Sequence, residues 1–245
     1  MRIGILRTDS VRQEFQGEFG DYPAMFRAML TASADDEPVE FRDYDVQHGE
    51  YPASIDECDA YLITGSRHSA YEDQPWIHRL ADFVRELDAA HHKLIGICFG
   101  HQLIAHTLGG ETRAAEQGWA VGVHDTCVLT PAEWMQPYRE RFGLLASHKD
   151  QVVRPPDGAE IFASTDFCPN SGFTIGDHIL TFQGHPEFSK GYSRALMDFR
   201  REMLGERRYN AGVESLEKPV HPSVVGRWIL NFIAAGESDA VPSDR

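Results

Sequence analysis

Residues 93–110 read KLIGICFGHQLIAHTLGG, and this stretch decides the fold of the chain. An apolar run leads into GICFG at positions 96–100, after which the apolar residues follow a helical spacing. The arrangement is the nucleophile-elbow pattern G-x-S-x-G with cysteine in place of serine. Such a turn from strand to helix is too sharp for flanking side chains, and it places Cys98 at a helix N-terminus, where a thiolate is favoured. The alternative is a buried strand cysteine beside two packing glycines.

A second motif ends a β-rich run at residues 179–189, which read ILTFQGHPEFS. A thiol nucleophile needs a base, and the base needs an orienting group. His185 and Glu187 are two residues apart, so in an extended segment they project to the same side, and Pro186 stiffens the backbone between them. Histidine in an ordinary strand is more often a surface or core residue. Together with a cysteine elbow, however, the pattern indicates that Glu187 holds the imidazole in the required tautomer, as in a Ser-His-Asp triad.

The two motifs resemble those of the class I glutamine amidotransferase family, whose members carry a Cys-His-Glu triad on a flavodoxin-like sheet. Two further stretches match, YLITGSRHSAYEDQPWI at 61–77 and SHKDQV at 147–152. The wording is most similar to the stand-alone branch, which includes gamma-glutamyl peptidases and GMP synthase-like proteins. The order of the triad differs from that of α/β-hydrolases, in which the acid precedes the histidine. The resemblance implies that the nucleophile, the general base and acid, and the orienting carboxylate are, in this order, Cys98, His185 and Glu187.

The resemblance also implies an oxyanion hole that combines the backbone N–H of Phe99 with one from the Gly65-Ser66 loop. A residue without Cβ at position 65 would let the backbone come close to the substrate carbonyl. Many amidotransferases carry Gly-Gly in this loop, whereas this chain continues with Ser66, Arg67 and His68. We expect these side chains to narrow or reshape the mouth of the pocket and so to affect which leaving group is accepted.

Substrate-binding residues follow from the same resemblance. Gln102 lies one helical turn beyond the elbow cysteine, so it is expected to face the same pocket and to help hold a γ-glutamyl substrate. Ser147 and His148 match a family segment that contributes to the pocket for the amino-acid end, although a loop turn with an ordinary polar surface is an equally good interpretation. His101 follows the elbow directly, and we expect a structural hydrogen bond from it rather than catalysis.

Composition and charge agree with a globular enzyme. The hydrophobic fraction of 42% and the charged fraction of 25% are those of a soluble protein. The formal net charge of −15 disfavours a nucleic-acid partner, which would need a basic face. The N-terminal stretch has no signal-peptide pattern, and no apolar run is long enough for a membrane span. We therefore expect a cytoplasmic location, no membrane partner, and no metal or organic cofactor.

The cysteines other than the elbow residue are Cys58, Cys127 and Cys168, and none forms a CxxC pair. This scatter is typical of reduced thiols rather than of a disulfide framework, and we interpret all three as structural or incidental. His91 and His92 lack ligand partners at metal spacing. We expect them in the last turn of the preceding helix, where cations are favoured.

Strand-like and helix-like segments alternate along the first half, which predicts βαβ units and a parallel sheet, and the middle of the chain is strand-rich. The fold class is therefore α/β, with an open, mostly parallel sheet flanked by helices and an antiparallel extension. Strands are expected at 2–6, 39–43, 60–64, 93–97, 122–129, 143–147, 160–164, 172–175 and 179–183. Helices are expected at 22–30, 76–91, 101–108, 191–204 and 223–234.

We expect one amidotransferase-like domain over residues 1–245, with a frayed tail at about 236–245. Residues 205–222 are charged and are interpreted as an irregular surface excursion. The stretch after Glu187 is too short for an ATP-using synthase domain, so any ammonia acceptor chemistry would reside on another chain.

Three classes of function stay open at this point. The first is a glutaminase that delivers ammonia to a partner synthase subunit. The second is a self-sufficient hydrolase of γ-glutamyl peptides or amides. The third is a non-catalytic regulatory protein on the same fold, which the intact triad and elbow disfavour. In both enzymatic classes the substrate is a small γ-glutamyl compound and the intermediate is a γ-glutamyl thioester on Cys98.

Overall fold

The computed structural model describes residues 1–35 and 38–235, and its main feature is one nine-stranded sheet. The expected frayed tail lies outside the described residues. The strand order is β2-β1-β3-β4-β11-β10-β9-β6-β7. The strands are β1 Arg2–Arg7, β2 Glu40–Asp45, β3 Ala60–Ile63, β4 Lys93–Ile97, β6 Ala120–Val128, β7 Arg141–His148, β9 Ala159–Ser164, β10 Gly172–Ile175 and β11 Ile179–Phe182.

The first five strands of this order pair in parallel, and the other four pair antiparallel. The parallel part has the 2-1-3-4-5 order of flavodoxin-like folds. The predicted class is therefore confirmed, including the antiparallel extension. The expected turn at Gly176 joins β10 to β11, and Gly176 adopts a positive φ of 53° there.

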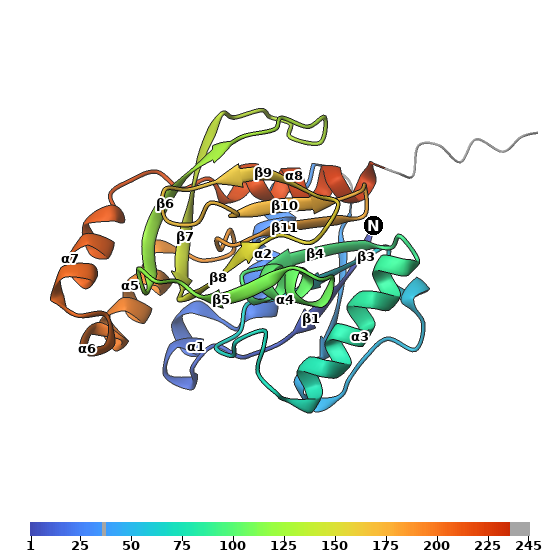
Figure 1. Cartoon of the computed structure of the whole chain (residues 1–245), viewed down its shortest axis with the longest axis horizontal. Helices are drawn as coiled ribbons and strands as arrows, with labels where there is room; N and C mark the ends of the chain where they lie inside the picture. The colour runs from blue at the N-terminus through green and yellow to red at the C-terminus, as the bar shows by residue number, and fades with distance from the viewer. Residues whose placement is uncertain (36–37, 236–245) are drawn as a thin grey trace, which may run out of the picture.

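Helices cover both faces of the sheet (Figure 1). On one face, α2 and α8 pack against the side chains of Ile3 and Ile5 in a core that includes Trp228. On the other face, α3 and α4 pack against Leu6 and Ile63. The helices are α1 Gln13–Phe19, α2 Tyr22–Ser33, α3 Pro75–Ala89, α4 Phe99–Thr107, α5 Lys190–Phe199, α6 Arg201–Leu204, α7 Glu206–Ser215 and α8 Pro222–Ala234, with 3₁₀ turns at Val46–His48 and Ile55–Glu57.

Several expectations need correction. The segment expected to be irregular at 205–222 contains α7, an amphipathic helix that packs against β6. The helix expected at 191–204 is two helices, because the backbone at Arg200 leaves helical geometry and α6 starts anew. Helix α1 was not expected, and neither was the small antiparallel sheet of β5 Glu111–Ala114 and β8 Asp150–Arg154. Helix α3 ends at Ala89, so His91 and His92 lie beyond it.

The elbow between β4 and α4 is packed backbone against backbone. A Cβ at Gly100 would lie 2.6 Å from the carbonyl oxygen of Ile63, and one at Gly96 would lie 2.8 Å from the carbonyl carbon of Gly100. Both glycines are therefore required by close approach, which holds the first turn of α4 against β3 and β4. Among the described residues, no helix is long and apolar enough to cross a membrane.

Gly100→Ala should lower the free energy of unfolding by about 1–3 kcal/mol, because the added methyl overpacks against the backbone of β3. The control is Gly17→Ala in α1, where a Cβ would meet nothing within 4 Å. That change should raise the free energy of unfolding by about 0.5–1 kcal/mol, because alanine is the better helix former. Denaturant unfolding measures both, and equal effects from the two variants would contradict the packing argument.

Candidate active site

Cys98 lies between β4 and α4 in a backbone conformation that L-residues rarely adopt, with φ 53° and ψ −98°. Its N–H donates to the carbonyl oxygen of Phe182 at 2.8 Å, and its own carbonyl accepts from Gln102 N–H at 3.0 Å. These bonds hold the strained turn between β11 and the first turn of α4. Conformations of this kind cost about 1–3 kcal/mol and gather at functional sites. The side chain is 5% exposed and reaches the walls of two cavities.

His185 follows β11, the strand next to β4, and is fixed on three sides. Its backbone N–H donates to Leu145 of β7 at 2.8 Å, and its ring stacks on Phe188 with centroids 3.8 Å apart. Its Nδ1 lies 2.8 Å from Oε1 of Glu187, a carboxylate whose side chain is fully buried. This bond leaves Nε2 as the nitrogen available to the Cys98 thiol.

The pKa of His185 reflects three opposing effects. Burial alone lowers it, but the charges of Glu187 and Cys98 outweigh burial and raise the pKa to about 10. An imidazolium is therefore the favoured form beside the elbow at neutral pH. A neighbouring imidazolium stabilises a thiolate, which is the nucleophilic form of cysteine.

Gly65 follows β3, the strand on the other side of β4. A Cβ at this position would lie 2.8 Å from Cε1 of His185 and 3.7 Å from Cβ of Cys98. The absence of a side chain therefore makes room first of all for the imidazole, rather than only for a substrate carbonyl as expected. The Ser66 N–H has no hydrogen-bond partner among the described residues, so it can serve a bound oxyanion, as can the unpaired N–H of Phe99 at the start of α4.

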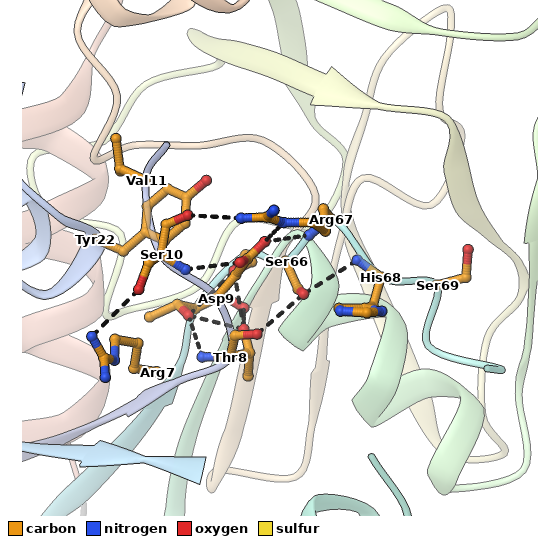
Figure 2. Close-up of polar contacts among 12 residues, drawn as sticks. Arg7, Thr8, Asp9, Ser10, Val11, Tyr22, Ser66, Arg67, His68 and Ser69 are labelled. Atoms are coloured by element: carbon orange, nitrogen blue, oxygen red, sulfur yellow. Dashed lines mark hydrogen bonds and ion pairs between the residues drawn. The ribbon is translucent and has the colours of Figure 1, made fainter. Parts of the chain in front are cut away.

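A polar network fixes the loop after β3 to the loop after β1 (Figure 2). The Asp9 carboxylate accepts from the backbone N–H of Arg67 at 2.9 Å and from its Nε at 2.8 Å. Ser66 Oγ donates to the Thr8 carbonyl and accepts from the His68 N–H, both at 3.2 Å. The Ser66 hydroxyl is therefore used inside the loop, and the Arg67 side chain is fixed by an ion pair at the mouth of the site.

The predicted substrate-binding residues gather beside Cys98. Gln102 is 3% exposed, and its Nε2 donates to the Asp150 carbonyl at 2.7 Å and to Gln183 Oε1 at 3.1 Å. His148 donates from Nδ1 to the same Asp150 carbonyl at 2.9 Å, and burial lowers its pKa to about 3, so the ring is neutral. The Oγ of Ser147 accepts from Arg200 Nη1 at 2.7 Å. The loop-turn interpretation of 147–148 is wrong, because both residues end β7.

Two cavities meet at Cys98. The His185-side cavity has a volume of about 90 Å³, and its lining includes His185, Phe188 and Arg12. The Gln102-side cavity has a volume of about 370 Å³, and its lining includes Gln102 and His148. The two cavities share a wall, and the residues that line both are Ser66, Arg67, Cys98, Ser147 and Arg200.

Sequence and structure comparisons agree with this geometry. The family model "Glutamine amidotransferase class-I" matches residues 31–201. The chain belongs to this family. It is 31% identical over 183 residues to gamma-glutamyl peptidase 2 of Arabidopsis thaliana, which covers 72% of this chain and 73% of that relative. It is also 31% identical over 134 residues to a glutamine-hydrolyzing GMP synthase subunit of Sulfolobus acidocaldarius, which covers 54% of this chain and 69% of that relative.

A solved structure supports the fold of the family. A glutamine amidotransferase from Thermotoga maritima aligns with a TM-score of 0.71 over 96% of both chains, at 18% sequence identity. At this identity the likeness concerns the fold alone.

Two residues of this amidotransferase-family site escaped the sequence reasoning. Asp9 follows β1 and holds the loop after β3, and Arg200 comes from the end of α5. Neither lies in a local motif, because their partners are 58 and 53 residues away. The TDS triplet directly after the first strand was the available signal for Asp9, since loops at the carboxyl ends of parallel strands meet at one edge. His101 behaves as expected and shares a structural hydrogen bond of 2.9 Å with Thr181 Oγ1.

The raised pKa of His185 predicts a pH dependence of stability. Its ordinary value is 6.5 and its value in the folded chain is about 10. The stabilisation is therefore complete below about pH 6.5 and is lost as the pH rises through about 10. The difference in free energy of unfolding between the wild type and Glu187→Gln should shrink across this window. The exposed Glu202→Gln serves as a control without such a trend, and a pH-independent difference for Glu187→Gln would contradict the assignment.

Proposed function

We propose that the chain hydrolyses the γ-glutamyl amide bond of a small substrate, with Cys98, His185 and Glu187 as a catalytic triad. The observation that carries the proposal is the strained elbow that presents Cys98 beside a buried, carboxylate-paired His185. Each triad member is more than nine-tenths buried, which strengthens the electrostatic interactions among them. The free thiols of the described residues suit a reducing compartment, and we include a cytoplasmic location in the proposal.

The proposed reaction has two stages. The Cys98 thiolate attacks the γ-carbonyl carbon, and the oxyanion accepts hydrogen bonds from the N–H groups of Phe99 and Ser66. His185 Nε2–H donates its proton to the departing amine, which leaves a γ-glutamyl thioester on Cys98. His185 then removes a proton from water, which attacks the thioester and releases glutamate. Glu187 keeps the imidazole oriented through both stages, and no step requires a metal or an organic cofactor.

The two cavities indicate how a substrate lies. The leaving amine must reach His185, so the leaving group belongs in the His185-side cavity. The glutamyl part then extends into the Gln102-side cavity, where the free Oε1 of Gln102 and the backbone of β7 face it. A single water-sized molecule needs only about 10–15 Å³ on this measure. The His185-side cavity of about 90 Å³ therefore accepts a leaving group larger than ammonia.

This size favours a self-sufficient γ-glutamyl hydrolase over an ammonia-delivering glutaminase. Arg200 adds a chemical reason, because its half-buried guanidinium is paired with no carboxylate among the described residues. A leaving group with a free carboxylate, as in a γ-glutamyl peptide, can pair with this charge. The second candidate is a glutaminase that feeds a synthase partner, and it rests on the similarity to the GMP synthase subunit of Sulfolobus acidocaldarius.

Cys98→Ala should lower glutamate release from γ-glutamyl dipeptides, glutathione and glutamine by more than about 10³-fold, because the thioester can no longer form. Cys127→Ala, which removes a partly exposed thiol away from the site, should retain wild-type activity. Purified protein that acts fast on the peptides alone supports the self-sufficient hydrolase. Slow release that is confined to glutamine supports the partner-dependent glutaminase, and an unchanged rate in Cys98→Ala would overturn both.

Arg200→Met should lower kcat/KM for γ-glutamylglycine roughly tenfold to a hundredfold, the equivalent of about 1.5–3 kcal/mol for a charged hydrogen bond. The same variant should act like the wild type on γ-glutamylglycinamide, which lacks the carboxylate. Arg194→Met, on an exposed face of α5, is the control for loss of a surface charge. An equal loss on both substrates would place the Arg200 contact on the glutamyl part instead.

A further inference from the structure

Three metal-ligating side chains meet at the edge of the sheet opposite to Cys98. They are His91, which follows α3, and Asp177 and His178, which precede β11. One ligand atom from each lies within 4.8 Å of the other two. The residues come from segments 86 or more positions apart, so the spacing along the sequence gave no sign of them.

The distances suit a small divalent ion. The Nδ1 atoms of His91 and His178 are 3.4 Å apart, and Oδ1 of Asp177 is 3.9 Å from Nδ1 of His178. Two nitrogens that bind one tetrahedral zinc ion at 2.0–2.1 Å are about 3.3–3.4 Å apart. An N–H···N hydrogen bond normally has a shorter separation, of about 2.9–3.0 Å. The pair of imidazoles is therefore spaced as ligands rather than as a good hydrogen-bonded pair.

His178 is already oriented as a metal ligand. Its side chain is 4% exposed, and its Nε2 donates to Oδ1 of Asp88 at 2.9 Å. This bond fixes the proton on Nε2 and leaves the lone pair of Nδ1 directed toward His91. A carboxylate on the far nitrogen of a ligating histidine is the usual outer partner in zinc sites, where it fixes the tautomer and raises the basicity of the ligand.

His91 occupies a position at which glycine is the usual residue. Its φ is 51°, and the bonds His91 N–H to Asp88 carbonyl (3.0 Å) and His92 N–H to Leu87 carbonyl (2.9 Å) make a Schellman motif after α3. The left-handed residue of this motif is most often glycine because a Cβ is strained there. A histidine at this position brings an imidazole to His178 at the expense of local strain. Strained residues of this kind gather at functional sites.

We propose that His91, Asp177 and His178 bind a divalent transition-metal ion, with zinc as the best match, and that solvent completes a tetrahedral site. His91 and Asp177 are exposed, so the ion can enter from solvent. The bound ion joins the end of α3 to the turn between β10 and β11. It thereby ties together the amino ends of β4 and β11, the two neighbouring strands whose carboxyl ends carry Cys98 and His185.

The test is titration of the full chain with zinc by calorimetry, and with cobalt by visible absorption, in the Cys98→Ala background. That background removes the reactive thiol as a competing ligand. We expect one equivalent to bind and to raise the melting temperature. His91→Gly and Asp177→Asn should each weaken binding by about tenfold or more, and Asp88→Asn by a similar factor through the outer partner. His91→Gly also relieves the strained φ, so its metal-free form should melt no lower than the parent.

His92→Ala is the matched control, since its neighbouring imidazole lies outside the cluster and should leave zinc affinity unchanged. In the otherwise wild-type chain, His91→Gly should retain glutamate release, because the site lies at the far edge of the sheet. Absence of saturable binding would overturn the proposal. Zinc affinity equal to that of the parent in both His91→Gly and Asp177→Asn would also overturn it and would show adventitious binding elsewhere.

Discussion

The parallel pairing of β3, β4 and β11 is the constraint on which the site depends. Ile63 pairs with Gly96, and Phe182 pairs with Ile97, so the three strands end at nearly the same level. The residues that follow them are therefore neighbours in space, although they are far apart along the chain. No loop has to reach over the sheet to bring the nucleophile, the base and the oxyanion loop together. The strand order alone does this, and side chains then refine the geometry.

Burial and charge oppose one another at the base. Desolvation disfavours a charged imidazole, and the chain offsets this cost with the Glu187 carboxylate and the Cys98 thiolate on either side of His185. Stacking on Phe188 holds the ring in the plane that both partners need. The second cation of the loop region, Arg67, is neutralised by Asp9. Arg200 differs, because its charge remains available to a ligand.

Local sequence signals predicted what local sequence decides. The bounds of β4 and β10 match the expected ones residue for residue, because apolar runs between turn residues decide them. The short polar strands β5 and β8 and the polar helix α7 were missed, because tertiary packing rather than hydrophobic periodicity stabilises them. In the site, the motifs predicted the triad residues and the substrate-side residues as neighbours. The ion pair at Asp9 and the cavities beside Cys98 follow from contacts between distant segments, which one sequence does not encode in any short pattern.

The walls of the His185-side cavity come from other parts of the chain than the triad does. The loop after β1 and helix α5 supply Arg12, Leu196, Phe199 and Arg200, whereas the reacting groups follow the central parallel strands. Gly65 cannot change without disturbing the imidazole, but the side chains on α5 meet no such restriction. Chemistry and selectivity are thus separate modules in this fold. A descendant of this chain can acquire a new leaving group by exchanging one helix face while its reaction centre stays constant, and a laboratory library can follow the same division.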